Sequence, residues 1–158
     1  MPSLIWIASL VSLHQASGAP IVTSKRAFHR LDGSYMAHCT ASDGEVFCDT
    51  NCLFVTREAF SLLSNWALMP AAFHPIDDRV IWFHILQSGL ARAHTGLATV
   101  GYRATHEGFY RDLGEAPPEG VKTSLASEIP LALQHWEQLG LPPLRPRWGY
   151  LVKGSDSI

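Results

Sequence analysis

The chain has 158 residues, of which 47% are hydrophobic and 16% are charged, and its net charge is −2 at neutral pH. This apolar share is sufficient for one packed domain and excludes a disordered chain. The charge is nearly balanced and forms no basic stripe, which disfavours nucleic-acid binding through phosphate neutralisation.

The first half of the chain predicts helices and strands in alternation. Apolar residues at helical spacing indicate an amphipathic helix over residues 3–17, and Gly18 is a typical stop signal. Short β-branched runs predict buried strands over 20–24 and 51–55. Between them, residues 25–49 contain turn signals, and we expect loops there with one or two short strands.

The second half continues this alternation. A helix over residues 57–68 is expected after a Thr56 cap, and a largely buried helix should follow from Asp77 to Gly89. The remaining expected elements are a strand–turn–strand unit over 91–105, a loop over 114–120, a helix over about 125–139, and an extended proline-rich tail over 141–148. This order predicts an α/β fold. The sequence has no glycine-rich phosphate-binding loop.

The N-terminal stretch permits a second interpretation as a signal peptide. It is apolar and has small residues near Ala16 to Ala19, but its first basic residue is Lys25. Because a signal peptide normally begins with a basic region, we prefer the helix. The run is also too short, and too interrupted by polar residues, to span a bilayer.

The three cysteines are Cys39, Cys48 and Cys52. An odd number cannot pair completely within one chain, and their spacing is not a standard zinc pattern. We therefore expect reduced thiols and a cytoplasmic protein. A small secreted protein with a cleaved N-terminus and a disulfide is the weaker alternative.

Adjacent carboxylates, Asp77 and Asp78, precede the apolar run of the expected buried helix. One Asp at a helix start is favoured by the exposed backbone N–H groups and by the helix dipole. Neighbouring helical residues point about 100° apart, so only one of the two can cap well. The other is free to act as a general base if it is held beside a cleft.

Three stretches together resemble the C-terminal half of GT-A glycosyltransferases, in particular glycosyltransferase family 2. They are 51-NCLFVTREAF-60, 77-DDRVIWFHILQSG-89 and 102-YRATHEGFY-110. In that family an Asn-containing strand leads into an "R-x-x-F" helix, an acidic pair then opens a helix, and a Tyr-containing strand follows. The resemblance covers roughly residues 1–112, and we expect residues 113–158 to form a loop, a helix and a proline-rich tail.

The resemblance implies transfer of a sugar from a nucleotide-diphosphate donor to an acceptor hydroxyl, in the inverting mode. Asp78 would be the general base and Asp77 its neighbour. The segment formed by Asp49, Thr50 and Asn51 would lie on the acceptor side. His106 would contact a divalent metal ion, Mn or Mg, or the diphosphate.

Two arginines flank His106 in the sequence. Arg103 and Arg111 either hold phosphate oxygens of the donor or pair with Glu107 and Asp112 on the surface. Both interpretations are open from the sequence.

One departure from the family is large. GT-A enzymes bind the donor with an N-terminal region that ends in an Asp-x-Asp metal motif, and no such motif occurs in this chain. We therefore expect an incomplete GT-A fold, a mixed sheet flanked by helices, from which the donor-binding half is missing. A non-catalytic α/β binding or interaction module is the alternative function.

Overall fold

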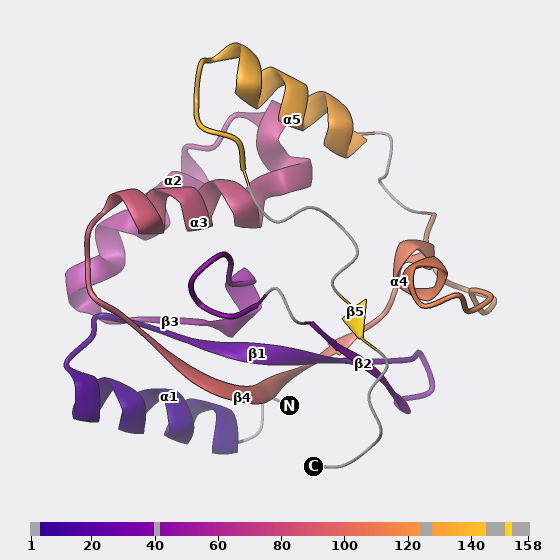
Figure 1. Ribbon diagram of the computed structural model, residues 1–158, viewed down its shortest axis with the longest axis horizontal. Helices are drawn as coiled ribbons and strands as arrows, with labels where there is room; N and C mark the ends of the chain where they lie inside the picture. Colours follow the sequence, from indigo (N-terminus) through magenta and orange to yellow (C-terminus); the bar gives the residue numbers. More distant parts are fainter. Residues whose placement is uncertain (1–3, 40–41, 124–127, 145–150, 153–158) are drawn as a thin grey trace.

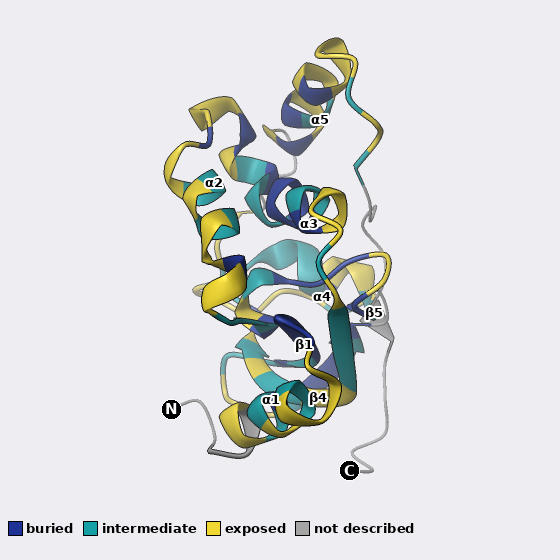
Figure 2. Ribbon diagram, turned by 90° about the vertical axis from the view of Figure 1, so that its left-hand side faces the viewer, coloured by how far each residue is buried: buried dark blue, intermediate teal, exposed yellow. Residues whose placement is uncertain are grey.

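The computed structural model describes residues 4–39, 42–123, 128–144 and 151–152 (Figure 1). It has a mixed β-sheet with helices on both faces, which confirms the expected α/β class. Helix α1 (Leu4–Ser17) packs under β4, and helices α2, α3 and α5 lie on the opposite face (Figures 1 and 2). No helix in these described ranges combines the length and apolarity needed to cross a membrane.

Strand β1 (Ile21–His29) is the centre of the sheet. It pairs in parallel with β4 (Arg92–Arg103) along one edge. Along its other edge it pairs antiparallel, first with β3 (Leu53–Val55) and then with β2 (Tyr35–Cys39). The short β5 (Leu151–Val152) pairs antiparallel with the outer edge of β2. The first four residues of β1 are buried, because helices cover both faces of the sheet there.

The helical segments connect these strands. Besides α1, they are η1 (Thr50–Cys52), η2 (Arg57–Leu63), α2 (Ser64–Ala67), η3 (Ala71–Ile76), α3 (Asp77–Gln87), α4 (Glu107–Asp112) and α5 (Glu128–Gln138), where η denotes a 3₁₀ helix. Helix α3 buries Val80, Ile81, Trp82 and Ile85, as its apolar sequence predicted, although Leu86 lies at the surface.

Helix α5 belongs to the main hydrophobic core. Its Trp136 ring contacts the rings of Phe73 and Phe83, with centroids 5.6 Å and 5.1 Å away. The Trp136 indole N–H also donates to the backbone oxygen of Pro142 at 2.8 Å. The C-terminal segment that we separated at residue 113 therefore completes the core of the preceding residues.

The expected strand–turn–strand unit over 91–105 is wrong. One 12-residue strand, β4, covers this segment. Thr23 of β1 is opposite His94 of β4, and Lys25 is opposite Ala98. More residues of β4 than of β1 lie between these two pairs, so β4 contains extra residues there. Gly96 has a φ of +70° at this point. Gly96 suggested a turn in the sequence, but it forms a β-bulge. A bulge and a turn can both require the left-handed conformation that glycine adopts easily.

The expected α-helix over 57–68 is mostly 3₁₀ in conformation, and the Thr56 side chain makes no capping bond. Serine and asparagine side chains interfere with regular helical bonding here. Ser64 Oγ donates to the backbone oxygen of Ser61 at 2.6 Å, and Asn65 Nδ2 donates to that of Leu62 at 3.0 Å. Such local bonds compete with the backbone ladder of an α-helix.

Candidate functional site

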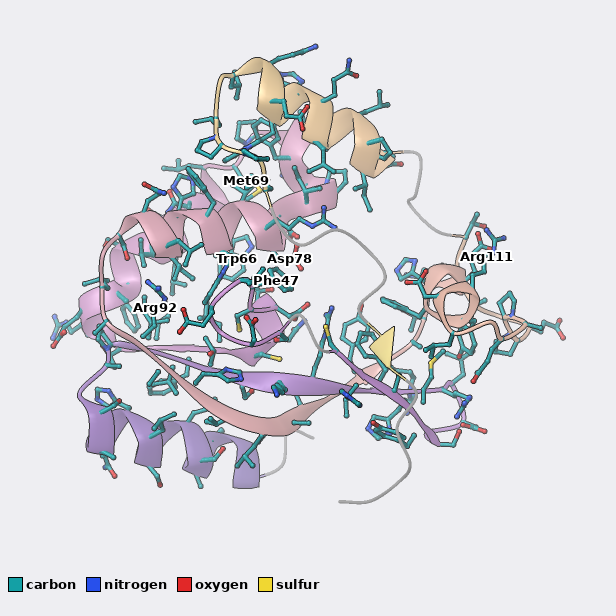
Figure 3. All side chains as sticks on the ribbon, in the orientation of Figure 1. Phe47, Trp66, Met69, Asp78, Arg92 and Arg111 are labelled. Atoms are coloured by element: carbon teal, nitrogen blue, oxygen red, sulfur yellow. The ribbon has the colours of Figure 1, made fainter. Side chains whose placement is uncertain are left out.

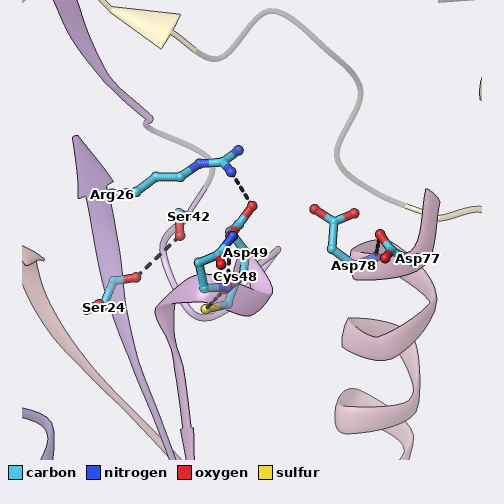
Figure 4. Close-up of polar contacts among 8 residues, drawn as sticks. Ser24, Arg26, Ser42, Cys48, Asp49, Asp77 and Asp78 are labelled. Atoms are coloured by element: carbon cyan, nitrogen blue, oxygen red, sulfur yellow. Dashed lines mark hydrogen bonds and ion pairs between the residues drawn. The ribbon is translucent and has the colours of Figure 1, made fainter. Parts of the chain in front are cut away.

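The acidic pair begins helix α3, and its two members have different roles. Asp77 is the first helical residue, and its Oδ1 accepts a hydrogen bond from the Asp78 backbone N–H at 2.7 Å. The Asp78 side chain instead extends away from the helix toward the segment around Asp49 (Figure 4). The two side chains point in different directions, as expected, but the expected cap is wrong: Ile76 is the N-cap of α3, and no side-chain capping bond forms there.

Asp78 is partly buried, and its protonation is strongly perturbed. Burial, together with the negative charges of Asp49 and Asp77, raises the pKa of Asp78 to about 6. The positive charges of Arg26 and Arg79 act in the opposite direction. A carboxyl group whose pKa lies near neutral pH can both take up and release a proton under physiological conditions, which is the property required of a general base.

Asp49 is buried opposite Asp78 and is held by several donors. It is the N-cap of η1, where its Oδ1 accepts from the backbone N–H and from the side-chain Nδ2 of Asn51, both at 2.9 Å. Asp is a favoured residue at such a cap. The other carboxylate oxygen of Asp49 is ion-paired with Nη1 of Arg26 (Figure 4).

Arg26 extends from β1 and places a cation between the sheet and α3. Its guanidinium carbon lies 4.8 Å from the ring centroid of Phe28 and 5.1 Å from that of Tyr102. Burial opposes the charge of Arg26, but Asp49 and, more weakly, Asp78 favour it, so that the pKa of Arg26 is raised. Stacking on two aromatic rings and an ion pair therefore fix one positive charge in this site.

Four residues thus form what we call the carboxylate cluster: Arg26, Asp49, Asp78 and Tyr102. Burial raises the pKa of the Tyr102 phenol, and the charges of Asp49 and Asp78 raise it further, while Arg26 lowers it. The cluster joins β1, β4, the segment preceding η1 and the start of α3. Its charged groups come from three parts of the chain that are far apart in sequence.

The other predicted site residues are placed in different ways. Asn51 is exposed and lies beside Asp49, while Thr50 is half-buried at the start of η1. His106 precedes α4, and its ring centroid lies 6.3 Å from that of Phe109. Phe109 in turn lies 5.7 Å from Tyr102, so an aromatic contact separates His106 from the carboxylate cluster.

The two arginines near His106 do not join the cluster. Arg103 follows Tyr102 directly in β4 and is exposed. Because successive strand side chains point to opposite faces, Arg103 projects away from the side that carries Tyr102. Arg111 pairs with Glu107 on the same helix at 3.0 Å, the surface alternative left open by the sequence. Arg103 therefore lies on the opposite face of β4 from the carboxylate cluster, and its contact with donor phosphates stays a prediction.

Metal binding was predicted at His106. Within the described ranges, His, Cys, Asp and Glu side chains form no group of three or more that is arranged to hold a metal ion. Asp49, the most deeply buried carboxylate of the cluster, is already bonded to Arg26 and Asn51. A bound Mn or Mg ion therefore stays a prediction.

All three cysteines, Cys39, Cys48 and Cys52, are free and buried, as the expectation of reduced thiols requires. Burial raises the pKa of Cys48 and raises that of Cys52 to about 12. These thiols stay protonated at neutral pH, and a protonated thiol is neither a nucleophile nor a metal ligand.

A cavity of about 290 Å³ lies along α3. Its lining consists of Glu45, Val46, Arg79, Trp82, Phe83, Leu86, Gln87, Pro142, Pro143 and Leu144. Asp78, Asn51 and His106 do not line this cavity. This cavity therefore contains none of the predicted site residues, and the carboxylate cluster is the candidate site.

Arg26 and Tyr102 are the site residues that the sequence did not identify. Arg26 was assigned to a loop because strand β1 was expected to end at residue 24. Residues 24–28 show no strict alternation of apolar and polar side chains, so no local signal indicated that the strand continues. The strand places Arg26 and Phe28 on one face of the sheet.

Comparison with known proteins does not assign this chain to a family. No protein-family model matches the chain, and neither the curated proteins nor the solved structures gave a match. The chemistry of the carboxylate cluster therefore carries the functional argument.

Proposed function

We propose that this chain is the acceptor-side part of an inverting glycosyltransferase of the family 2 type, with Asp78 as the general base. The observation that carries the proposal is the Asp78 carboxylate, which is held at the start of a buried helix with its pKa raised to about 6. The resemblance of the three sequence stretches supplies the reaction class.

The reaction follows from what an ionised carboxylate can do at this position. Asp78 accepts the proton of an acceptor hydroxyl while the hydroxyl oxygen forms a bond to the anomeric carbon of the donor sugar. The bond from that carbon to the diphosphate oxygen breaks, and the nucleotide diphosphate leaves with the bonding electrons. A single displacement of this kind inverts the configuration at the anomeric carbon.

Other residues have supporting roles in this proposal. Asn51 is exposed beside the cluster, where its Nδ2 donates to Asp49, and we assign it to contact with an acceptor hydroxyl. Asp49 is committed to Arg26 and to the η1 cap, so we assign it to the support of the site and not to substrate contact. A divalent ion, when bound, would neutralise the charge of the departing diphosphate.

A transfer assay tests the proposal. The full chain is incubated with a panel of nucleotide-diphosphate sugars and hydroxyl acceptors, alone and with a separately supplied donor-binding chain that carries an Asp-x-Asp motif. Products are identified by mass spectrometry. We expect Asp78→Asn to lower turnover by about 10²–10⁴-fold, the usual contribution of a general base. The matched variant Asp77→Asn should retain turnover within about tenfold.

Two outcomes would contradict the proposal. Unchanged turnover in a folded Asp78→Asn variant would return this residue to a structural role. Absence of both transfer and nucleotide-sugar binding under every condition would favour a non-catalytic α/β interaction module, in which the acidic pair only starts a helix.

A further inference from the structure

The carboxylate cluster contains two carboxylates and one guanidinium, and the mechanism above uses only Asp78. Arg26 is ion-paired with Asp49, and its guanidinium is stacked over the rings of Phe28 and Tyr102. Asp49 is in turn fixed by two bonds from Asn51. These contacts hold both partners of the ion pair in one geometry on the side of the site that faces Asp78 (Figure 4).

We infer that the Arg26–Asp49 ion pair is the positioning element of this site, which places one positive and one negative charge opposite Asp78 and so governs proton exchange at that carboxylate. This inference rests on the proposed function only in one respect, which is that proton exchange at Asp78 serves sugar transfer. The arrangement of the charges is independent of any sugar substrate.

The burial of the pair indicates a role beyond surface charge pairing. The side chains of Arg26 and Asp49 are only 14% and 6% exposed, whereas the Arg111 side chain in the surface pair with Glu107 is 66% exposed. Buried charged pairs seldom add net stability over apolar packing, because both charges lose their hydration. The Arg26 Nε group is also buried without a hydrogen-bond partner, so part of the donor capacity of the guanidinium is unused in this conformation.

The two members of the pair act on Asp78 in opposite directions. The Asp49 charge favours the protonated form of Asp78, and the Arg26 charge favours the ionised form. The other groups that face Asp78 are Asp77 and Arg79 on α3, with opposite signs, and Tyr102 on β4. Removal of either member should therefore move the titration of Asp78, and the direction of movement identifies which charge was lost.

The test is an NMR titration of the carboxyl carbons in the full chain, with no sugar present. The Asp78 midpoint is expected near pH 6 in the wild type. In Asp49→Asn it should move to lower pH, because the repelling charge is gone and Arg26 is released toward Asp78. In Arg26→Met it should move to higher pH, and Arg26→Lys, which retains the charge, should restore most of the wild-type midpoint.

A matched control is Arg111→Met, which removes a cation from the surface pair with Glu107. It should leave the Asp78 midpoint unchanged, because an exposed charge is screened by solvent. Asp78 midpoints that stay the same in both Asp49→Asn and Arg26→Met would overturn the inference, and so would shifts of the same sign in the two variants.

A wild-type measurement covers the case in which a variant fails to fold, since breaking a buried pair leaves one charge uncompensated. The Arg26 Nε–H resonance should change position with the same midpoint as the Asp78 carboxyl carbon. An Arg26 resonance that does not follow Asp78 would overturn the inference. Because none of these readouts involves transfer, failure of the glycosyltransferase proposal and failure of the positioning role are distinguishable.

Discussion

Arg26 on β1 and Asp49 at the start of η1 are separated by 23 residues in sequence and form a buried ion pair. The pair lies opposite Asp78 (Figure 4), which is the second residue of α3 and is labelled at the start of that helix in Figure 3. The sheet supplies the cation, a helical cap supplies one carboxylate, and a second helix supplies the other. The protonation of Asp78 consequently depends on the packing of three elements, and this dependence can be measured.

The first prediction concerns stability as a function of pH. The pKa of Asp78 is raised from 3.8 to about 6, so folding favours its protonated form. The contribution of protonated Asp78 to the free energy of unfolding is fully present below pH 3.8 and is lost as the pH rises through 6. Asp78→Asn, which stays neutral, should therefore be more stable than the wild type above pH 6, by about 2–3 kcal/mol at most. The two proteins should converge below pH 4 in urea unfolding experiments.

Asp43 provides a control with the opposite sign. Burial alone would raise the pKa of Asp43, but hydrogen bonds from the backbone N–H groups of Glu45, Val46 and Phe47 lower it overall. Its contribution is present above pH 3.8 and is lost as the pH falls through the lowered value. Asp43→Ala should lose about 1–2 kcal/mol at pH 7. A gain in stability there, or an Asp78→Asn variant less stable than the wild type at pH 8, would contradict these assignments.

The second prediction concerns the pH profile of sugar transfer. If Asp78 is the base, it must be ionised, so kcat/KM should rise about tenfold per pH unit below 6 and become level above it. In Asp49→Asn the break in the profile should move to lower pH, because the repelling carboxylate is absent. A profile that is flat between pH 5 and 8 would exclude Asp78 as the base.

The third prediction tests the close approach of a loop to the sheet. Gly44 has a φ of +75°, and a Cβ atom there would lie 2.6 Å from Thr23 Oγ1 and 2.9 Å from His94 Nδ1. Thr23 and His94 are themselves hydrogen-bonded at 2.8 Å. Gly44→Ala should destabilise the protein by about 3 kcal/mol, because it combines backbone strain with a clash.

Gly33→Ala is the matched control for this change. Gly33 also has a positive φ, +90°, but no atom lies within 4 Å of a Cβ built there. It should lose only about 1–2 kcal/mol, the cost of the left-handed conformation alone. Equal losses in both variants, measured by thermal unfolding, would show that the loop containing Gly44 moves away without cost.

The fourth prediction concerns the docking of α5. Trp136 is 3% exposed, packs on Phe73 and Phe83, and donates to Pro142. Trp136→Ala should cost about 3–5 kcal/mol through the cavity it creates. The control Leu131→Ala removes a side chain of the same helix that is 66% exposed, and it should change stability by less than about 0.5 kcal/mol. A small effect of Trp136→Ala in urea unfolding would mean that α5 is not part of the cooperative core.

Local patterns in the sequence were sufficient for several elements. The apolar run after Asp78 predicted the buried helix α3, because periodicity along a helix depends on residues only a few positions apart. The β-branched runs predicted the start of β1 and the end of β3. The Asp-Gly pairs in residues 25–49 predicted turns, and Gly33 and Gly44 have positive φ. The different roles of Asp77 and Asp78 also followed from helical geometry alone.

The same local reasoning failed where distant pairing decided the conformation. Residues 25–29 contain turn-like and charged residues, yet β1 continues through them because β2 and β4 pair with both of its edges. The bulge at Gly96 likewise depends on the register with β1, so the glycine alone could not distinguish it from a turn.

What the sequence determined by itself is the place of Asp77 and Asp78 at the start of a buried helix, since this is set by neighbouring residues. Only the tertiary structure decided that Arg26 pairs with Asp49 and that both face Asp78. Desolvation and charge proximity are properties of packed elements and not of a sequence window. For that reason the predicted base could be named from the sequence, whereas the residues that tune its proton affinity could not.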